Sequence, residues 1–210
     1  MGQRSCMKIY ILAAGKGSRM GTFTNDWPKV MTRIGHETLI SSLVRQWHQW
    51  SQKKIYVVGR YHANVLQTHL HSLPEPTEMV FEPFPHREAG SSVHFARQHA
   101  QSDCWIISGD SYIPDDFFDQ LSITEKQHKL FIQEHSPPTK LMAVKDRLLH
   151  SSSGSAHYAG ISYWLKCSHH KEPTSGAFTL AQYIAETLKE EPFILEGTGV
   201  ISNFNSRILV

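Results

Sequence analysis

Short apolar runs alternate with segments of helical period along the first half of the chain. The apolar runs are partly β-branched and predict buried strands at Lys8–Ala14, Lys54–Gly59, Glu78–Glu82 and Trp105–Ser108. Between them, apolar residues at helical spacing predict helices at Thr38–Trp50, Asn64–Leu70 and Ser91–Gln101. Because strands that alternate with helices join through crossover connections, this order predicts a mainly parallel central sheet with helices on both faces.

The pattern changes after about Leu130. Strands are predicted within KLFIQEHS, KLMAVKD and HYAGISYWLK, a helix at Phe178–Leu188, and a closing strand at Thr198–Phe204. The sequence contains no internal repeat and no linker long enough to separate two domains. We therefore expect one α/β domain over residues 1–210, with a three-layer α/β/α arrangement.

Composition excludes several classes of protein. The chain has 210 residues, 40% of them hydrophobic, and a net charge of +2 from 21 cationic and 19 acidic residues, which is too balanced for a general nucleic-acid binder. Its longest apolar stretch, Ile9–Ala14, is too short to insert across a membrane, and no secretory leader is evident. Three widely spaced cysteines form no disulfide framework, so we expect a cytoplasmic location.

A glycine-rich loop follows the first predicted strand, in the stretch ILAAGKGSRM. It is not a Walker A loop, because Lys16 is followed by Gly17 rather than by Ser or Thr. It also fails the G-x-G-x-x-G dinucleotide pattern, because Met20 stands where the third glycine belongs. A solvated turn between a strand and a helix is the structural alternative.

The loop does match a nucleotidyltransferase pattern, L-x-x-G-x-G-x-R-[LM] followed by P-K. Every position of that pattern is satisfied, by Leu12, Gly15, Gly17, Arg19, Met20, Pro28 and Lys29. Glycines let backbone N–H groups approach a triphosphate, and a loop at the carboxyl end of a parallel strand lies where ligands bind. Lys16 and Arg19 could neutralise the β- and γ-phosphates, and Lys29 the α-phosphate.

Two further elements could hold a metal ion. The predicted strand Trp105–Ser108 is followed by Asp110, whose carboxylate could bind Mg²⁺ against the α-phosphate. The alternative is that Asp110 caps a helix near Pro114. Near the C-terminus, Asn205, or else Asn203, could offer a carbonyl oxygen to the same ion.

These residues resemble the nucleoside-triphosphate transferase superfamily over nearly the whole chain, and within it the bacterial phosphocholine cytidylyltransferases. AGISYW resembles part of their acceptor lobe, and FEPFPHREAGSSVHFA the segment that carries their nucleobase loop. The resemblance implies a Rossmann-like fold, CTP as donor, Mg²⁺ as cofactor, and transfer of CMP to a phosphorylated amino alcohol, with phosphocholine as the first candidate, and release of pyrophosphate. Residues 7–125 would form the nucleotide-binding half and 126–210 the acceptor-binding half.

The resemblance also assigns roles to individual residues. The nucleotide-binding set would be Leu12, Ala13, Ala14, Gly15, Lys16, Gly17 and Arg19, with Gly90 and Ser91 lining the base pocket. Lys29, Arg19 and Asp110 would be catalytic, and Asp110, together with Asn205, would also hold Mg²⁺. The second metal position carries an acidic residue in many relatives, where this chain has asparagine.

The acceptor site is predicted from aromatic residues on the acceptor side. A quaternary ammonium favours aromatic faces, and Tyr112, Tyr158, Gly160 and Tyr163 are the candidates. Strand alternation lets at most one of Tyr163 and Trp164 face a pocket, and such aromatics also serve as core. A sugar 1-phosphate or 2-aminoethylphosphonate acceptor stays open, as does a catalytically weak nucleotide-binding domain.

Overall fold

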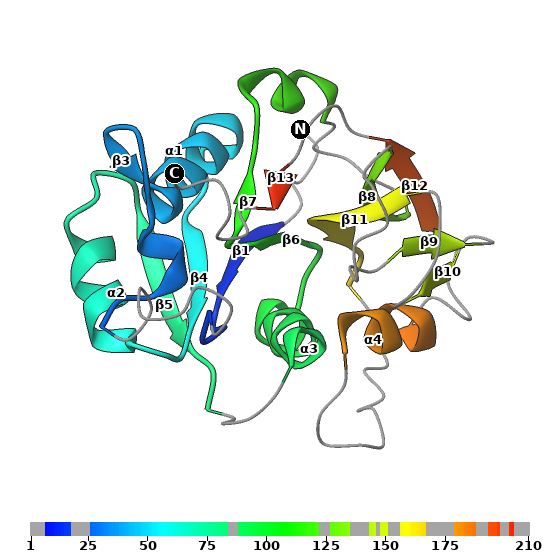
Figure 1. Cartoon of the computed structure of the whole chain (residues 1–210), viewed down its shortest axis with the longest axis horizontal. Coiled ribbons are helices and arrows are strands. Elements are labelled where there is room, and N and C mark those ends of the chain that lie inside the picture. Colours follow the sequence, from blue (N-terminus) through cyan, green and yellow to red (C-terminus); the bar gives the residue numbers. More distant parts are fainter. Residues whose placement is uncertain are drawn as a thin grey trace, which may run out of the picture.

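The computed structural model describes residues 7–17, 26–83, 88–121, 127–134, 143–145, 148–150, 156–166, 179–187, 193–197 and 202–203. A twisted sheet runs through the middle of the molecule, with α1 and α2 on one face and α3 and α4 on the other (Figure 1). The predicted mostly parallel sheet flanked by helices is confirmed.

The helices are α1 Leu39–Ser51, α2 Ala63–His71, α3 Ala89–Ala100 and α4 Leu180–Thr187, with 3₁₀ helices at Lys29–Met31 and Asp115–Gln120. The strands of the first half are β1 Lys8–Ala13, β2 Arg33–Ile34, β3 Glu37–Thr38, β4 Ile55–Gly59, β5 Thr77–Phe81, β6 Cys104–Ser108 and β7 Ser111–Tyr112. Those of the second half are β8 His128–Glu134, β9 Ala143–Lys145, β10 Leu148–His150, β11 Ala156–Trp164, β12 Phe193–Gly197 and β13 Ser202–Asn203.

Four neighbouring parallel strands form the first-half part of the sheet, in the order β5-β4-β1-β6, with β5 at its edge. The chain runs outward from β1 to β4 and β5, then crosses to the other side of β1 to form β6. Strand β11 pairs antiparallel with β6 and joins the second half of the chain to the same sheet. The reversal of direction at β1 creates a switch point, where open α/β sheets bind their ligands.

Two apolar layers hold the helices against the sheet. The α1 side is centred on Trp47 and Trp105, whose ring centroids lie 5.3 Å apart, and Tyr163 joins this cluster. The α3 side contains Val93 and Tyr183, so that α3 and α4 share one core. Because each strand sends alternate residues to these two layers, the central strands read as continuous apolar runs.

Helix α1 illustrates why the boundaries fall where they do. Thr38 is its N-cap, and the side-chain oxygen of Thr38 accepts from the backbone N–H of Ser41 at 3.2 Å. The helix ends where Gln52 adopts a left-handed conformation, with a φ of 56°. None of the helices in the described part of the chain is long and apolar enough to cross a membrane.

Candidate active site

The ends of β1 and β6 meet at the switch point of the sheet. Leu12 on β1 is in register with Ser108 on β6, and the N–H of Gly109 donates to the carbonyl oxygen of Leu12 at 2.9 Å. A Cβ on Gly109 would lie only 2.5 Å from that oxygen, so the two backbones are close enough to require glycine. The glycine-rich loop that follows β1, called the nucleotide loop below after the role that the sequence predicts for it, and Asp110 therefore leave neighbouring strands at the same edge.

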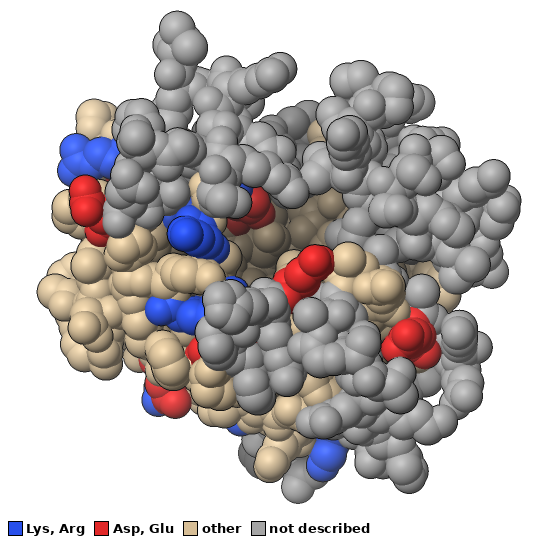
Figure 2. All heavy atoms as spheres, turned by 60° about the horizontal axis from the view of Figure 1, so that its bottom comes forward, with Lys and Arg blue, Asp and Glu red and all other residues tan. Residues whose placement is uncertain are grey.

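A cavity of about 340 Å³ opens at this edge, within the size range of small-ligand pockets. Its lining comes from the nucleotide loop, the turn after β6, the start of α3, strand β11 and helix α4. The lining residues are Leu12, Ala13, Ala14, Gly15, Gly17, Lys29, Val30, Arg60, Glu88, Ala89, Ser92, Val93, Ile106, Ser108, Asp110, Tyr158, Gly160 and Leu180. In Figure 2, both cationic and acidic side chains border the hollow in the face that this view presents.

The nucleotide loop lies where the sequence predicts it. Leu12, Ala13, Ala14 and the two glycines Gly15 and Gly17 line the cavity. Gly17 has a φ of 68°, a left-handed conformation that other residues rarely adopt. Lys16 is exposed and is not among the lining residues, and Arg19 lies outside the residues that the structure describes.

Lys29 reaches the cavity from a separate segment. Pro28 precedes it with a φ of −59°, which suits the start of the 3₁₀ helix Lys29–Met31. Thr32 closes this turn, because its hydroxyl donates to the carbonyl oxygen of Lys29 at 2.7 Å. The P-K pair therefore builds a rigid base from which the Lys29 side chain extends to Asp110.

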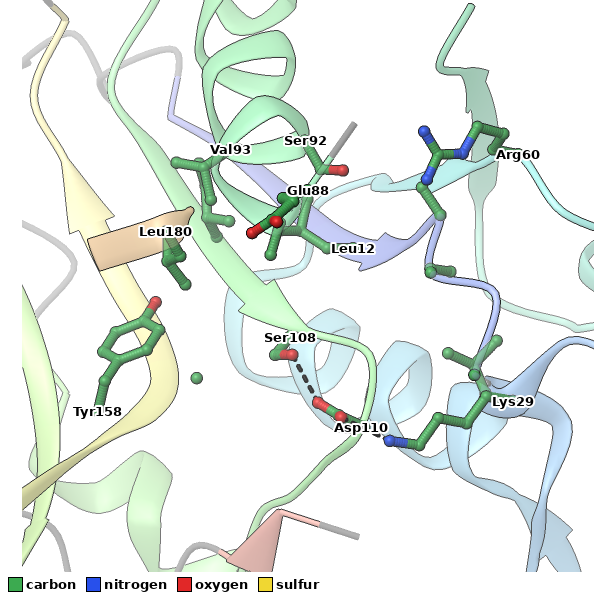
Figure 3. A pocket seen from close by; sticks show the side chains of 18 residues that line it. Leu12, Lys29, Arg60, Glu88, Ser92, Val93, Ser108, Asp110, Tyr158 and Leu180 are labelled. Atoms are coloured by element: carbon green, nitrogen blue, oxygen red, sulfur yellow. Dashed lines mark hydrogen bonds and ion pairs between the residues drawn. The ribbon is translucent and has the colours of Figure 1, made fainter. Parts of the chain in front are cut away.

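Asp110 is the centre of the polar contacts in the cavity. The Lys29 ammonium Nζ lies 2.7 Å from Asp110 Oδ2, and the Ser108 hydroxyl donates to Asp110 Oδ1 at 2.6 Å (Figure 3). The Lys29 and Asp110 side chains are 17% and 29% exposed, so this ion pair is partly shielded from water. Pro114, not Asp110, is the N-cap of the following 3₁₀ helix.

Helix α3 presents a different face to the cavity from the one that the sequence predicts. Glu88, Ala89 and Ser92 line it together with Val93, whereas Gly90 and Ser91 are buried and do not. The four lining positions lie on one face because residues four apart lie one helical turn apart. The side chain of Glu88, the N-cap residue, points into the cavity without capping the helix (Figure 3).

Strand β11 brings Tyr158 and Gly160 to the cavity. A register shift between Tyr158 and Ser162 marks a bulge, and Gly160 within it has a φ of 82°. The Tyr158 hydroxyl donates to the Ser162 hydroxyl at 2.9 Å. Burial raises the pKa of Tyr158 above its usual value, so its hydroxyl stays protonated at neutral pH.

The structure does not bring the other two predicted acceptor tyrosines to the cavity. Tyr163 lies on the opposite face of β11 from Tyr158, because five positions separate them along a strand of period two. It packs on Trp105 with ring centroids 5.1 Å apart, and its hydroxyl donates to Asp103 at 3.2 Å. Tyr112 on β7 is 40% exposed and is not among the lining residues.

Sequence reasoning missed several lining residues, above all Arg60, Ser108 and Glu88. Arg60 directly follows β4, so its place at the carboxyl end of a parallel strand was the signal that could have identified it. Asn205, the predicted second metal ligand, lies outside the described residues, as does the side chain of Asn203. Within the described ranges, no group of three or more His, Cys, Asp or Glu side chains could hold a metal ion.

A family model, the MobA-like NTP transferase domain, matches residues 9–135. The chain belongs to this family. It is a nucleotidyltransferase, and the matched residues include both the nucleotide loop and Asp110. Enzymes of this kind generally use a divalent metal ion.

Three solved structures share the fold of this nucleotidyltransferase across nearly the whole chain. A Bacillus anthracis protein assigned as a glucose-1-phosphate thymidylyltransferase has 15% identity and a TM-score of 0.81, over 96% of this chain and 91% of its own. A CTP:phosphocholine cytidylyltransferase from Streptococcus pneumoniae has 17% identity and a TM-score of 0.75, over 96% and 94%. The inositol-1-phosphate CTP transferase of T. maritima has 15% identity and a TM-score of 0.78, over 99% and 92%.

Proposed function

We propose that this nucleotidyltransferase transfers CMP from CTP to phosphocholine and releases pyrophosphate. The observation that carries the choice of acceptor is the chemistry of one wall of the cavity. Val93, Ile106, Tyr158, Gly160 and Leu180 form that wall and offer an apolar surface with one aromatic ring. A trimethylammonium group needs no hydrogen-bond partner and is attracted to an aromatic ring by about 0.5–2 kcal/mol.

The orientation of Tyr158 supports this acceptor over a sugar 1-phosphate. Its hydroxyl already donates to Ser162, so the ring is the part of the side chain available to a ligand. A sugar would bring several hydroxyl groups, each of which loses its water on binding and requires a polar partner. Among the described residues, the Tyr158 hydroxyl is the one polar side-chain group on this wall, and its proton is already donated to Ser162.

The opposite part of the cavity suits a nucleoside triphosphate. The glycine loop and the cations Lys29 and Arg60 favour the polyphosphate, while the Glu88 carboxylate, which accepts hydrogen bonds, favours a base with an exocyclic amino group. Cytosine carries such a group and uracil and thymine do not, so Glu88 distinguishes CTP from UTP and dTTP, although adenine and guanine carry exocyclic amino groups as well. Two of the three similar structures, named for CTP transferases, agree with this choice.

The proposed reaction is an in-line displacement at the α-phosphorus. A phosphate oxygen of the acceptor forms a bond to that phosphorus, and the bond to the bridging oxygen breaks, so pyrophosphate leaves with the electron pair. The acceptor phosphate is already ionised at neutral pH, so no general base is required. This chain's contribution is positioning and charge stabilisation, with Lys29 at the α-phosphate. Lys16 and Arg19 are proposed for the β- and γ-phosphates from the sequence pattern alone, because Lys16 is not among the lining residues and Arg19 lies outside the described residues.

The residues present fit Mg²⁺. Asp110 supplies a hard carboxylate oxygen at the edge of the cavity, and Mg²⁺ is commonly held by one or two carboxylates together with substrate phosphates. When bound, the ion would neutralise charge that develops on the α-phosphate. Asp110 would be its principal ligand in this chain, with Asn205 as the proposed second.

The proposal is tested by pyrophosphate release in the presence of Mg²⁺. CTP, UTP, GTP and dTTP are each combined with phosphocholine, 2-aminoethylphosphonate and glucose 1-phosphate, and Lys29→Ala serves as the matched blank. We expect turnover with CTP and phosphocholine, reduced about 10²–10³-fold in Lys29→Ala by analogy with loss of an oxyanion donor. Turnover only with the sugar phosphate or only with the phosphonate would replace the acceptor, and nucleotide binding without turnover would favour a weak or non-catalytic domain.

A further inference from the structure

Asp110 uses both of its carboxylate oxygens in the structure, and the two partners are of different kinds. Oδ1 accepts from the hydroxyl of Ser108, two residues earlier in the chain, at 2.6 Å. Oδ2 contacts the ammonium of Lys29, which comes from a segment 81 residues away, at 2.7 Å. Figure 3 shows Asp110 between these two side chains at the lower edge of the cavity.

The Ser108 partner is fixed. Ser108 is the last residue of β6 and is in register with Leu12 on β1, so the sheet holds its backbone. The adjacent Gly109 is tied to Leu12 by a backbone hydrogen bond of 2.9 Å. With one short side-chain torsion, the Ser108 hydroxyl has little freedom to leave Oδ1.

The Lys29 partner can move. Its backbone belongs to a rigid turn, but the ammonium sits at the end of a flexible four-carbon stem with rotatable donors. A divalent cation that approaches Oδ2 would meet the positive charge of Lys29 at the same oxygen, and like charges at contact distance repel. A polyphosphate in the cavity would offer the ammonium another negative partner.

We propose that Ser108 is a positioning residue that holds the Asp110 carboxylate by Oδ1, and that Lys29 occupies the metal-binding oxygen Oδ2 until nucleotide draws it away. Lys29 therefore opposes metal binding in the free enzyme and ceases to do so when the triphosphate is bound. Metal and nucleotide then bind cooperatively, because each favours the arrangement that the other needs. This inference rests on the proposed function in one respect, the identity of the nucleotide that draws Lys29 away from Asp110.

The test is Mn²⁺ binding, followed by the electron paramagnetic resonance signal of the free ion, with and without CTP. Mn²⁺ is the probe because it takes the same oxygen ligands as Mg²⁺. The proteins compared are the wild type, Lys29→Met, Ser108→Ala and Ser108→Thr. Asp110→Asn gives the baseline, because it lacks the carboxylate that is proposed to bind the metal ion. Far-UV circular dichroism and urea denaturation identify any variant that has lost its fold.

Lys29→Met should bind Mn²⁺ several-fold more tightly than wild type without CTP, although it removes a residue that catalysis needs. Ser108→Ala should weaken binding about 10-fold or more, as loss of a partner to a metal ligand does, and Ser108→Thr should restore it. A merely structural role for Lys29 predicts no such gain in affinity.

Equal or weaker Mn²⁺ binding in Lys29→Met overturns the role of Lys29, and wild-type binding in folded Ser108→Ala overturns that of Ser108. Equal binding by wild type and Asp110→Asn with CTP present, after the Mn²⁺ bound by CTP alone in a protein-free sample is subtracted, overturns the metal site itself. The proposed substrates are judged separately, by wild-type pyrophosphate release: if that fails while Lys29→Met still binds Mn²⁺ more tightly, the substrates are wrong and the competition at Oδ2 stands.

Discussion

Replacing Gly109 by alanine should damage the active site through backbone sterics alone. A Cβ at this position would lie 2.5 Å from the carbonyl oxygen of Leu12 and 2.7 Å from a methyl carbon of Val30. The first of these is a backbone atom, so the new methyl cannot be accommodated by a change of rotamer. The contact must open from 2.5 Å to at least 3.0 Å, which moves the turn after β6 away from the nucleotide loop.

The size of the effect follows from what that turn holds. Asp110 is the next residue, and Lys29 and Ser108 contact its carboxylate at 2.7 and 2.6 Å. We expect a loss of about 1–3 kcal/mol in the free energy of unfolding, as for other overpacked sites. A displacement of about 1 Å at a reacting group can lower kcat/KM about 10²-fold.

The assay combines urea denaturation with initial rates of pyrophosphate release. Gly197→Ala is the matched control, because none of the described atoms lies within 4 Å of a Cβ built there and Gly197 is on β12, away from the cavity. We expect the control to keep wild-type stability and rate. Wild-type kcat/KM in Gly109→Ala would refute the reasoning, because it would mean that the turn can shift without moving Asp110.

Three further predictions concern base choice, a buried cation and pH. Glu88→Gln should raise the rate with UTP relative to CTP, because an amide can donate to a base carbonyl whereas a carboxylate only accepts. Competition between UTP and CTP measures this ratio of rates, and an unchanged ratio would mean that Glu88 does not recognise the base. Arg97 is 3% exposed and donates to the Tyr183 hydroxyl at 2.9 Å. Tyr183→Phe should therefore lower the free energy of unfolding by about 1–3 kcal/mol, because it leaves the buried Arg97 without this hydrogen-bond acceptor. Arg97→Met should lower it by less, because it removes the buried charge itself, and the reverse order in urea denaturation would contradict this. Burial lowers the pKa of His69 and of His99 in the folded protein. Near pH 6.5 the unfolded chain therefore binds more protons than the folded chain, and the free energy of unfolding should fall as the pH drops through that value. Replacing both histidines by glutamine should flatten the dependence, and an unchanged slope would assign it to other groups.

Strands β1, β4 and β6 could be predicted because each is an apolar run that is largely buried on both faces, whereas β5 lies at the end of the sheet and is partly exposed. The predicted strand Lys54–Gly59 agrees with β4 to within one residue. In the second half, β12 was not predicted at Phe193–Gly197, because Ile194 is 41% exposed and Glu196 follows, so the segment lacks the continuous apolar run that identifies β1, β4 and β6. The predicted strand at Thr198–Phe204 corresponds in the described residues to β13 Ser202–Asn203 alone.

The part of the candidate site that belongs to the glycine-loop motif or directly follows a predicted strand could be predicted from the sequence. Lys29 and Asp110 were both predicted, and they form an ion pair at 2.7 Å across 81 residues of sequence. Which face of α3 meets the cavity depends on its packing against the sheet, so Ser91 was predicted to line the cavity where Ser92 does. In the same way, period-two spacing places the two tyrosines of β11, Tyr158 and Tyr163, on opposite faces but could not indicate which of them faces the cavity.

The central claim, that this chain transfers a nucleotidyl group, is tested most directly by following the fate of the α-phosphate. Phosphorus-31 NMR of the enzyme with CTP, phosphocholine and Mg²⁺ distinguishes a diphosphate diester, pyrophosphate and orthophosphate. We expect a diphosphate diester and pyrophosphate in equal amounts, both formed about 10²–10³ times more slowly by Lys29→Ala. Orthophosphate from the γ-position, or a γ-phosphate attached to the acceptor, would contradict attack at the α-phosphorus and assign the site a different reaction.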